Sequence, residues 1–116
     1  MSEPHEQALS AIFHALADPT RRAMLRRLAA GEQTVSALAE PYAMSLAAAS
    51  KHIVVLERAG LVRRTVTGRT HHCRLAAEGL REAQSWLRYY ERFWNERLDA
   101  LAELLAEEPG EAERGS

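Results

Sequence analysis

The chain has one cysteine and one lysine among its 116 residues. Because Cys73 is the only cysteine, the chain can form neither an internal disulfide nor a zinc site closed by cysteines alone. The sequence has no apolar run of about 18 residues, which argues against a membrane-spanning helix. The first residues, MSEPHEQALS, show neither the basic start nor the apolar stretch of a secretion signal. These absences predict a cytoplasmic protein with no membrane partner.

The net charge of −1 hides an uneven distribution along the chain. Residues 45–74 carry six basic side chains and only Glu57 as an acid, which is a net +5. Residues 75–116 carry a net −5, and residues 1–44 carry −1. A basic segment between neutral and acidic flanks would let one face approach phosphates while the rest is repelled. Chance clustering of surface arginines would give the same count, so charge alone does not decide for DNA.

Capping residues and helix breakers mark four short helices in the first sixty residues. The expected helices cover residues 6–17, 19–30, 35–40 and 46–59. Asp18, Thr34 and Ser45 are the expected N-caps of the last three, and Gly60 ends the fourth. The arginine doublets of the second helix, at 21–22 and 26–27, are expected on its solvated face.

A β-hairpin is predicted directly after the fourth helix. Residues 61–66 and 70–75 form its strands, and Gly68 in the turn supplies a positive φ. The third and fourth helices, joined by a short turn, form a helix-turn-helix pattern, and the hairpin after them makes it a winged helix. The expected fold is mainly α with a small β-hairpin, in the order of four helices, two strands and a fifth helix.

The fifth helix is predicted to run from about residue 77 to residue 107, where the sequence has no proline. Gly79 lies in its first turn and weakens the start by roughly 1 kcal/mol. The helix would be roughly 45 Å long, and a chain of this size cannot cover all of it with its own residues.

We expect one DNA-binding and dimerisation domain over residues 1–107, followed by a disordered acidic tail over 108–116.

A long apolar stripe on the fifth helix predicts a two-fold homodimer in which this helix packs against its mate, helped by the first helix. The alternative is a helix that lies across its own domain. The expected interface residues are Leu9, Ile12, Phe13, Leu80, Leu87, Tyr90, Phe93, Trp94, Leu98 and Leu101.

Several segments together resemble a known family. The strings ALADPTRRAMLRRL, MSLAAASKHIVVLERAGLVRR and GRTHHCRL resemble the ArsR/SmtB family of bacterial winged-helix repressors. The later WLRYYERFWNERLDAL resembles the last helix of a metal-independent branch of that family, and the resemblance covers about residues 8–105. It implies a homodimer that binds double-stranded DNA at an inverted-repeat operator and blocks transcription until a signal releases it. Members of this branch often repress their own gene.

The resemblance also implies which residues face DNA. They are Ser45, Ala47, Ala48, Ser50, Lys51 and His52 on the fourth helix, and Arg69 and Thr70 at the hairpin tip. The N-terminal end of such a helix reaches base edges in the major groove. Leu46 to Ala49 stand where family members often carry longer polar side chains, so phosphate contacts and DNA shape should matter more. His52 could instead be an interior histidine bonded to a neighbouring turn.

The metal sites familiar in the family do not match this sequence. Thr34 and Ser36 stand where thiolates would be needed, and residues 77–107 contain no histidine. In a strand His71 and Cys73 share a face, but Cys73 is more readily explained as a small buried apolar residue. We expect no metal and no cofactor.

Two other functions stay open. One is a regulator that senses a metal or small molecule through His71 and Cys73 or through the dimer helix. The other is a protein-interaction dimer whose winged helix does not bind DNA. An enzyme is not expected, because the sequence has no catalytic triad pattern, phosphate loop or HExxH motif.

Overall fold

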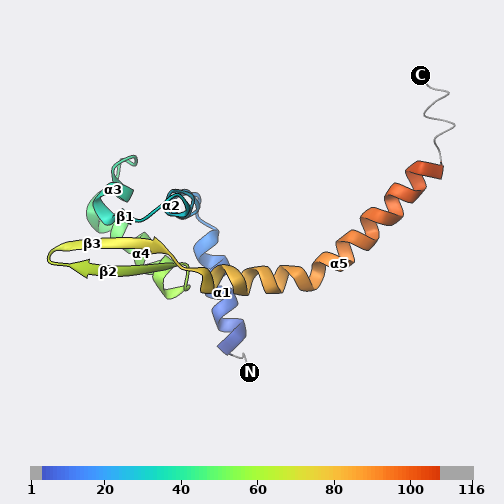
Figure 1. Ribbon diagram of the computed structural model, residues 1–116, viewed down its shortest axis with the longest axis horizontal. Coiled ribbons are helices and arrows are strands. Elements are labelled where there is room, and N and C mark those ends of the chain that lie inside the picture. The colour runs from blue at the N-terminus through green and yellow to red at the C-terminus, as the bar shows by residue number, and fades with distance from the viewer. Residues whose placement is uncertain (1–3, 108–116) are drawn as a thin grey trace, which may run out of the picture. The chain divides into compact units, whose positions relative to one another are not determined.

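The computed structural model describes residues 4–107, so the predicted acidic tail lies outside the described residues. It divides into two compact units, Met1–Ala83 and Gln84–Ser116. The elements are α1 (Pro4–Leu16), α2 (Pro19–Ala29), β1 (Gln33–Thr34), α3 (Val35–Ala39), α4 (Leu46–Arg58), β2 (Val62–Thr67), β3 (Thr70–Leu75) and α5 (Ala77–Glu107) (Figure 1). The predicted winged helix-turn-helix is confirmed.

Side-chain caps set where the helices of the first unit begin. Asp18 accepts a hydrogen bond from the amide of Arg21, at 2.9 Å, and so begins α2. Thr34 and Ser45 begin α3 and α4 in the same way, each accepting from an amide three residues ahead at 3.1 Å. Each cap satisfies an amide that has no partner inside its helix. All three predicted N-caps are confirmed.

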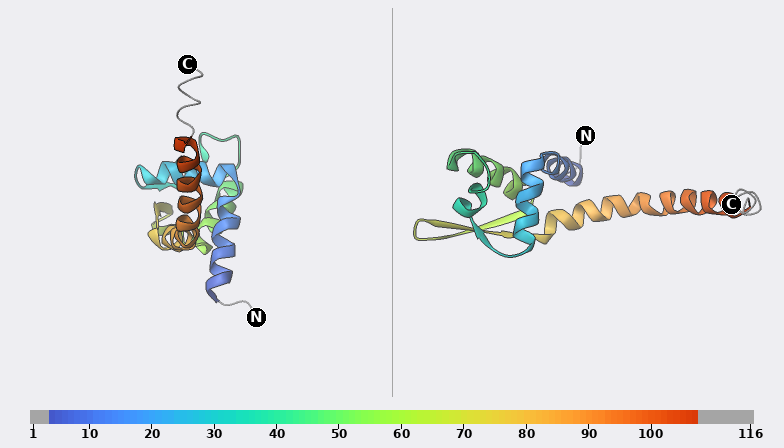
Figure 2. Two further views of the ribbon diagram at one scale, coloured as in Figure 1. Left: turned by 90° about the vertical axis from the view of Figure 1, so that its right-hand side faces the viewer. Right: turned by 90° about the horizontal axis from the view of Figure 1, so that it is seen from above.

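The sheet has three antiparallel strands in the order β1-β3-β2, one more than predicted. β2 and β3 form the predicted hairpin, in which Gly68 adopts φ 62° at the turn. Gln33 and Thr34 pair with Cys73 and His72 on the outer edge of β3. The extra strand has two residues, which is too short to show an alternating pattern. Figure 2 shows the hairpin edge-on, with α3 and α4 on one side of it.

One apolar core joins the helices and sheet of the first unit. Its fully buried large side chains are Ile12, Met24, Leu38, Ile53, Leu56, Leu61 and Cys73. Helix α4 turns Ala49, Ile53 and Leu56 inward, the face that their spacing predicts. Burial of this face anchors α4 and leaves its other side exposed.

Two predicted interface residues of α1 are buried within the single chain. Leu9 is 7% exposed and Ile12 is 1% exposed. Their side chains are covered by the chain's own residues, and their part in a dimer interface stays a prediction. Phe13 is half-buried and packs against the same core.

Gly79 lies where α5 meets the turn after α4. A Cβ at this position would be 2.6 Å from the carbonyl oxygen of Ala59 and 2.9 Å from that of Gly60. The amide of Gly79 donates to the Gly60 oxygen, at 2.9 Å. The glycine that weakens the helix start by its propensity is therefore required for a close backbone contact.

From Gln84 onward the described side chains of α5 are exposed, with Tyr90 half-buried. Aromatic side chains contact one another along this part of the helix: the rings of Tyr89 and Tyr90 meet edge-on with centroids 4.9 Å apart. The exposed apolar side chains here include Leu87, Phe93, Trp94, Leu98, Leu101, Leu104 and Leu105. The single domain over residues 1–107 stays a prediction; the two compact units meet inside α5, after Ala83, where side-chain burial stops. No helix among residues 4–107 is long and apolar enough to cross a membrane.

Candidate nucleic-acid interface

The N-terminal half of α4 presents a set of small and polar side chains to solvent. Ala47 and Lys51 are exposed, and so is the capping residue Ser45. Ser50 and Ala48 are half-buried along the edges of this face. Because Ala47 and Ser50 are short, another surface can approach the helix backbone closely here, with Lys51 as the one long cationic side chain.

A hollow of about 300 Å³ separates this part of α4 from the hairpin. It is lined by Thr34, Val35, Ser36, Leu46, Ser50, Arg64, Arg69, Thr70 and His71. The structure thus brings Ser50 of the predicted DNA-facing set together with Arg69 and Thr70 of the hairpin. Most of the lining groups are hydroxyls or cations, and these are groups that bind phosphate oxygens.

A second hollow, of about 490 Å³, lies along the outer side of α4. Its lining residues are Ala47, Ser50, Lys51, Val54, Val55 and Arg58. Ser50 borders both hollows and is therefore the ridge between them. Ala47, Ser50 and Lys51 consequently form one surface, with Arg58 at its far end.

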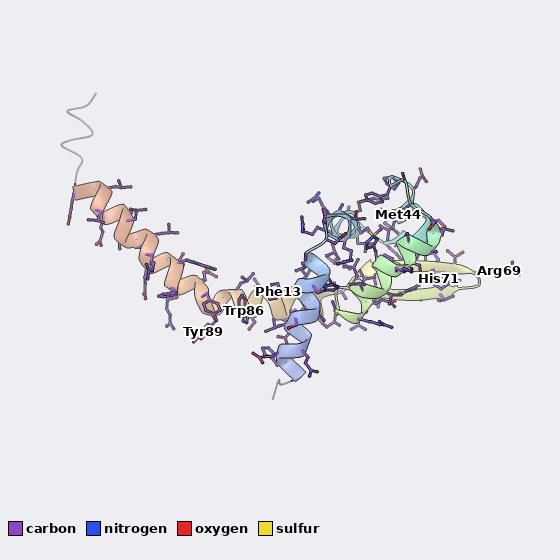
Figure 3. All side chains as sticks on the ribbon, turned by 180° about the vertical axis from the view of Figure 1, so that it is seen from behind. Phe13, Met44, Arg69, His71, Trp86 and Tyr89 are labelled. Atoms are coloured by element: carbon purple, nitrogen blue, oxygen red, sulfur yellow. The ribbon has the colours of Figure 1, made fainter. Side chains whose placement is uncertain are left out.

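The hairpin carries Arg69 at its tip, where Figure 3 shows it pointing away from the helices. Closer to its base, Arg64 of β2 donates to Glu57 of α4, at 2.5 Å. The other side of the same guanidinium lies 3.4 Å from Nδ1 of His71 on β3. This bridge ties both hairpin strands to α4, so that the hairpin and the helix present a single surface.

Ion pairs neutralise part of the net charge of +5 that the sequence gives for residues 45–74. Arg64 pairs with Glu57, and Arg63 pairs with Glu78 of α5. Among residues 4–107, the cations of this segment that have no acidic partner are Lys51, Arg58, Arg69 and Arg74. Three of these four, all except Arg74, lie on the hollows or at the hairpin tip. The excess positive charge is therefore concentrated on the face formed by α4 and the hairpin.

His52 differs from the other predicted DNA-facing residues. It is half-buried and lines neither hollow. Its Nδ1 lies 3.2 Å from Nη1 of Arg21 on α2. This contact matches the alternative of an interior histidine bonded to a neighbouring turn.

The prediction that both arginine doublets are solvated is wrong for two of the four side chains. Arg21 is half-buried and donates to the carbonyl oxygens of His14 and Ala15. Arg27 is also half-buried, and it donates to the carbonyl oxygens of Ala37, at 2.8 Å, and Leu38, at 3.0 Å. Each binds carbonyls in the last turn of a neighbouring helix, where few backbone amides follow to donate to them. A spacing pattern gives no sign of such contacts between elements.

His71 and Cys73 have different environments, although they share one face of β3. Cys73 is fully buried, and that burial raises the pKa of its thiol above the usual 9.0. His71 is exposed beside Arg64. A neutral buried thiol is a poor metal ligand, since the thiolate is the form that binds. Residues 4–107 contain no cluster of three or more potential metal ligands.

Several residues of this surface are absent from the sequence prediction. Leu46 is 57% exposed and lines the first hollow, together with Thr34 and Ser36 from the start of α3. Leu46 directly follows the Ser45 cap, and a residue in the first turn of a helix can face outward whatever its polarity. This position in the first turn was the sequence signal from which the exposure of Leu46 could have been predicted. Nothing in the sequence indicates Thr34 and Ser36, because β1 is what places them beside the hairpin.

Comparison with known proteins agrees with this geometry. A family profile described as a helix-turn-helix domain matches residues 16–65. The chain is 38% identical over 96 residues to the HTH-type transcriptional regulator Rv2034 of Mycobacterium tuberculosis, covering 83% of this chain and 87% of that protein. The crystal structure of the ArsR family transcriptional regulator RHA00566 is 41% identical, with a TM-score of 0.74 over 82% of this chain and 97% of the other. The chain belongs to the ArsR family.

As an ArsR family member, the chain is a DNA-binding transcriptional regulator, and the proteins it matches are regulators rather than enzymes. A further ArsR-like neighbour is the homodimeric winged helix-turn-helix domain of Mb0332 from Mycobacterium bovis, solved in solution. It is 27% identical, with a TM-score of 0.59 over 95% of this chain and 92% of that one.

Proposed function

We propose that this ArsR family protein is a homodimeric repressor that binds an inverted-repeat operator through α4 and the hairpin. It acts by binding alone, on chromosomal DNA in the cytoplasm, and carries out no chemical reaction. The observation that carries the proposal is the continuous surface of Ala47, Ser50 and Lys51, with Arg69 projecting from the hairpin beside it.

In this arrangement α4 enters the major groove by its N-terminal end. Lys51 donates to a guanine edge or to a phosphate, and the methyl group of Ala47 meets a thymine methyl. Leu46 adds a larger apolar contact from the rim of the first hollow. The side chain of Arg69 enters or flanks the adjacent minor groove, where the negative potential attracts arginine.

The homodimer is supported by the exposed apolar side chains of α5 and by the homodimeric neighbour from Mycobacterium bovis. Leu87, Phe93, Trp94, Leu98 and Leu101 are each more than 40% exposed in the single chain. Apolar exposure of this kind is typical of an interface. A two-fold dimer would present two copies of α4, which an inverted repeat matches by its own symmetry.

Fluorescence anisotropy on the DNA upstream of the protein's own gene, titrated in salt, tests the proposal. Lys51→Ala should weaken binding by about 1–3 kcal/mol if Lys51 contacts a base. Arg69→Ala should weaken binding to all sequences alike and reduce the salt slope by about 1. The expected wild-type result is tight binding with a steep salt dependence that zinc does not change.

Arg74→Ala is the matched control. It removes the same charge from an exposed residue of β3 that lines neither hollow. Its affinity should stay close to that of the wild type. Equal losses in all three variants would mean that net charge, and not this surface, determines binding. Release of DNA by zinc would favour a metal sensor.

A further inference from the structure

Arg21 contacts three elements of the first unit at once. Its amide donates to the Asp18 cap of α2, while its Nε and Nη2 donate to the carbonyl oxygens of Ala15, at 2.8 Å, and His14, at 3.0 Å. Its Nη1 faces Nδ1 of His52 on α4, at 3.2 Å. One half-buried guanidinium therefore joins the end of α1 and the start of α2 to the helix that we assign to DNA.

The chemistry of this contact determines the state of His52. Arginine stays protonated in proteins and has no acceptor atom. For Nη1–H to donate across this contact, Nδ1 of His52 has to be the acceptor, which places the ring hydrogen on Nε2. A charged ring would instead direct an N–H at the guanidinium.

We propose that Arg21 is a positioning residue for DNA binding, holding His52 as the Nε2–H tautomer and so fixing α4 against α1 and α2. The DNA part of this inference rests on the proposed function. In that role the Nδ1 of His52 holds α4 in place, which is the interior role that the half-burial of its side chain indicates.

Arg22 offers a matched control on the same helix. Its Nη1 donates to the carbonyl oxygen of Leu16, at 2.8 Å, so it also binds the end of α1. It is exposed, and none of its hydrogen bonds in the described chain reaches α4. A variant of Arg22 removes a contact to α1 and one positive charge, as a variant of Arg21 does, but leaves His52 untouched.

The first measurement is the tautomer of His52 in the full-length free protein at neutral pH, from long-range nitrogen–proton NMR correlations. We expect the Nε2–H form in the wild type and in Arg22→Gln, and a mixture of tautomers in Arg21→Gln. A wild-type ring that is charged or protonated on Nδ1 overturns the inference, whatever the protein does with DNA.

The second measurement is operator affinity, taken well below the melting temperature of each variant. We expect Arg21→Gln to weaken binding by about tenfold, and Arg22→Gln by less than about twofold. The loss from Arg21→Gln should shrink when His52→Ala is already present, because the two act through one contact. An equal loss in both backgrounds means that Arg21 only stabilises α1, and overturns the positioning role.

The two measurements distinguish failure of the proposed function from failure of this inference. A wild-type protein that binds no operator overturns the proposed function and, with it, the role of Arg21 in DNA binding. The tautomer still decides whether Arg21 sets the state of His52. Normal operator binding together with the wrong tautomer overturns the inference and leaves the proposed function standing.

Discussion

At the scale of single residues, Gly79 shows how a position can be decided by its neighbours and not by helix propensity. Alanine is the better helix former by about 1 kcal/mol, so propensity alone favours Gly79→Ala. The added methyl group would however lie within 3 Å of two backbone oxygens, so the backbone would have to shift to admit it.

We expect Gly79→Ala to lower the free energy of unfolding by about 1–3 kcal/mol, because the new Cβ overpacks this contact. Urea denaturation followed by circular dichroism measures the change. Ser85→Ala is the control, since it adds helix propensity at an exposed position of the same helix. A Gly79→Ala protein as stable as the wild type would show that the backbone here can shift easily.

For the binding surface, the sequence predicts which residues of α4 share a face, but not which residues of other helices contact them. Ala47, Ser50 and Lys51 stand three and four residues apart on one helix, so their spacing alone predicts a shared face. The partner of His52 comes from α2, thirty-one residues away. Contacts of that kind depend on how helices pack, and no local pattern contains them.

At the scale of elements, the start of α2 depends on the charge of one carboxylate. The amide of Arg21 donates to Asp18, and this bond, with a smaller contribution from the positive charge of the Arg21 side chain, lowers the pKa of Asp18 below its usual 3.8. A lowered pKa means that the folded chain holds this proton less tightly than the unfolded chain does. The cap therefore stabilises the fold above the unfolded pKa, and that stability is lost as the pH falls through the folded value.

Asp18→Ala should lower the free energy of unfolding at pH 7 by about 1 kcal/mol, because it removes the cap. Asp18→Asn keeps a capping oxygen without a titrating proton. Urea denaturation between about pH 6 and pH 3 should therefore show a wild-type advantage over Asp18→Asn that shrinks as the pH falls. An advantage that stays constant over this range would mean that the charge of Asp18 has no part in the cap.

Most elements were predictable because their ends carry local signals. Asp18, Thr34, Ser45 and Gly68 each act on the backbone within three residues of themselves, and all four do in the structure what the sequence predicts. β1 was not predictable. Its two residues become a strand because β3 offers them an unpaired edge.

At the scale of the whole molecule, the prediction concerns assembly. If α5 packs against a second copy, a charge in its apolar stripe should separate the two chains, since a buried unpaired carboxylate is costly. Leu98→Glu should shift the protein from dimer to monomer in sedimentation velocity, and weaken operator binding because only one half-site is held at a time.

Ser85→Glu is the matched control for assembly. It introduces the same charge into α5, roughly on the opposite side of the helix from Leu98 at 3.6 residues per turn. This variant should stay dimeric. If Leu98→Glu is still a dimer at the same concentration, α5 is not the main contact between the copies.

Assembly is also where sequence and single-chain structure diverge most. Leu9, Ile12 and Leu98 look alike as apolar residues at helical spacing. The first two are covered by the chain's own core, and Leu98 is 61% exposed. Helical periodicity shows that a face is apolar and does not show what covers it. The burial of each side chain in the single chain is needed to distinguish the covered residues of α1 from the exposed residues of α5.

The exposed position of Lys51 has a practical consequence. It is the chain's one lysine, so an amine-acylating reagent has a single side-chain target in addition to the terminal amine. That target lies on the face we assign to DNA. The mass of the acylated protein, recorded with and without a candidate DNA, would therefore report occupancy of this face on the natural chain, without any introduced label.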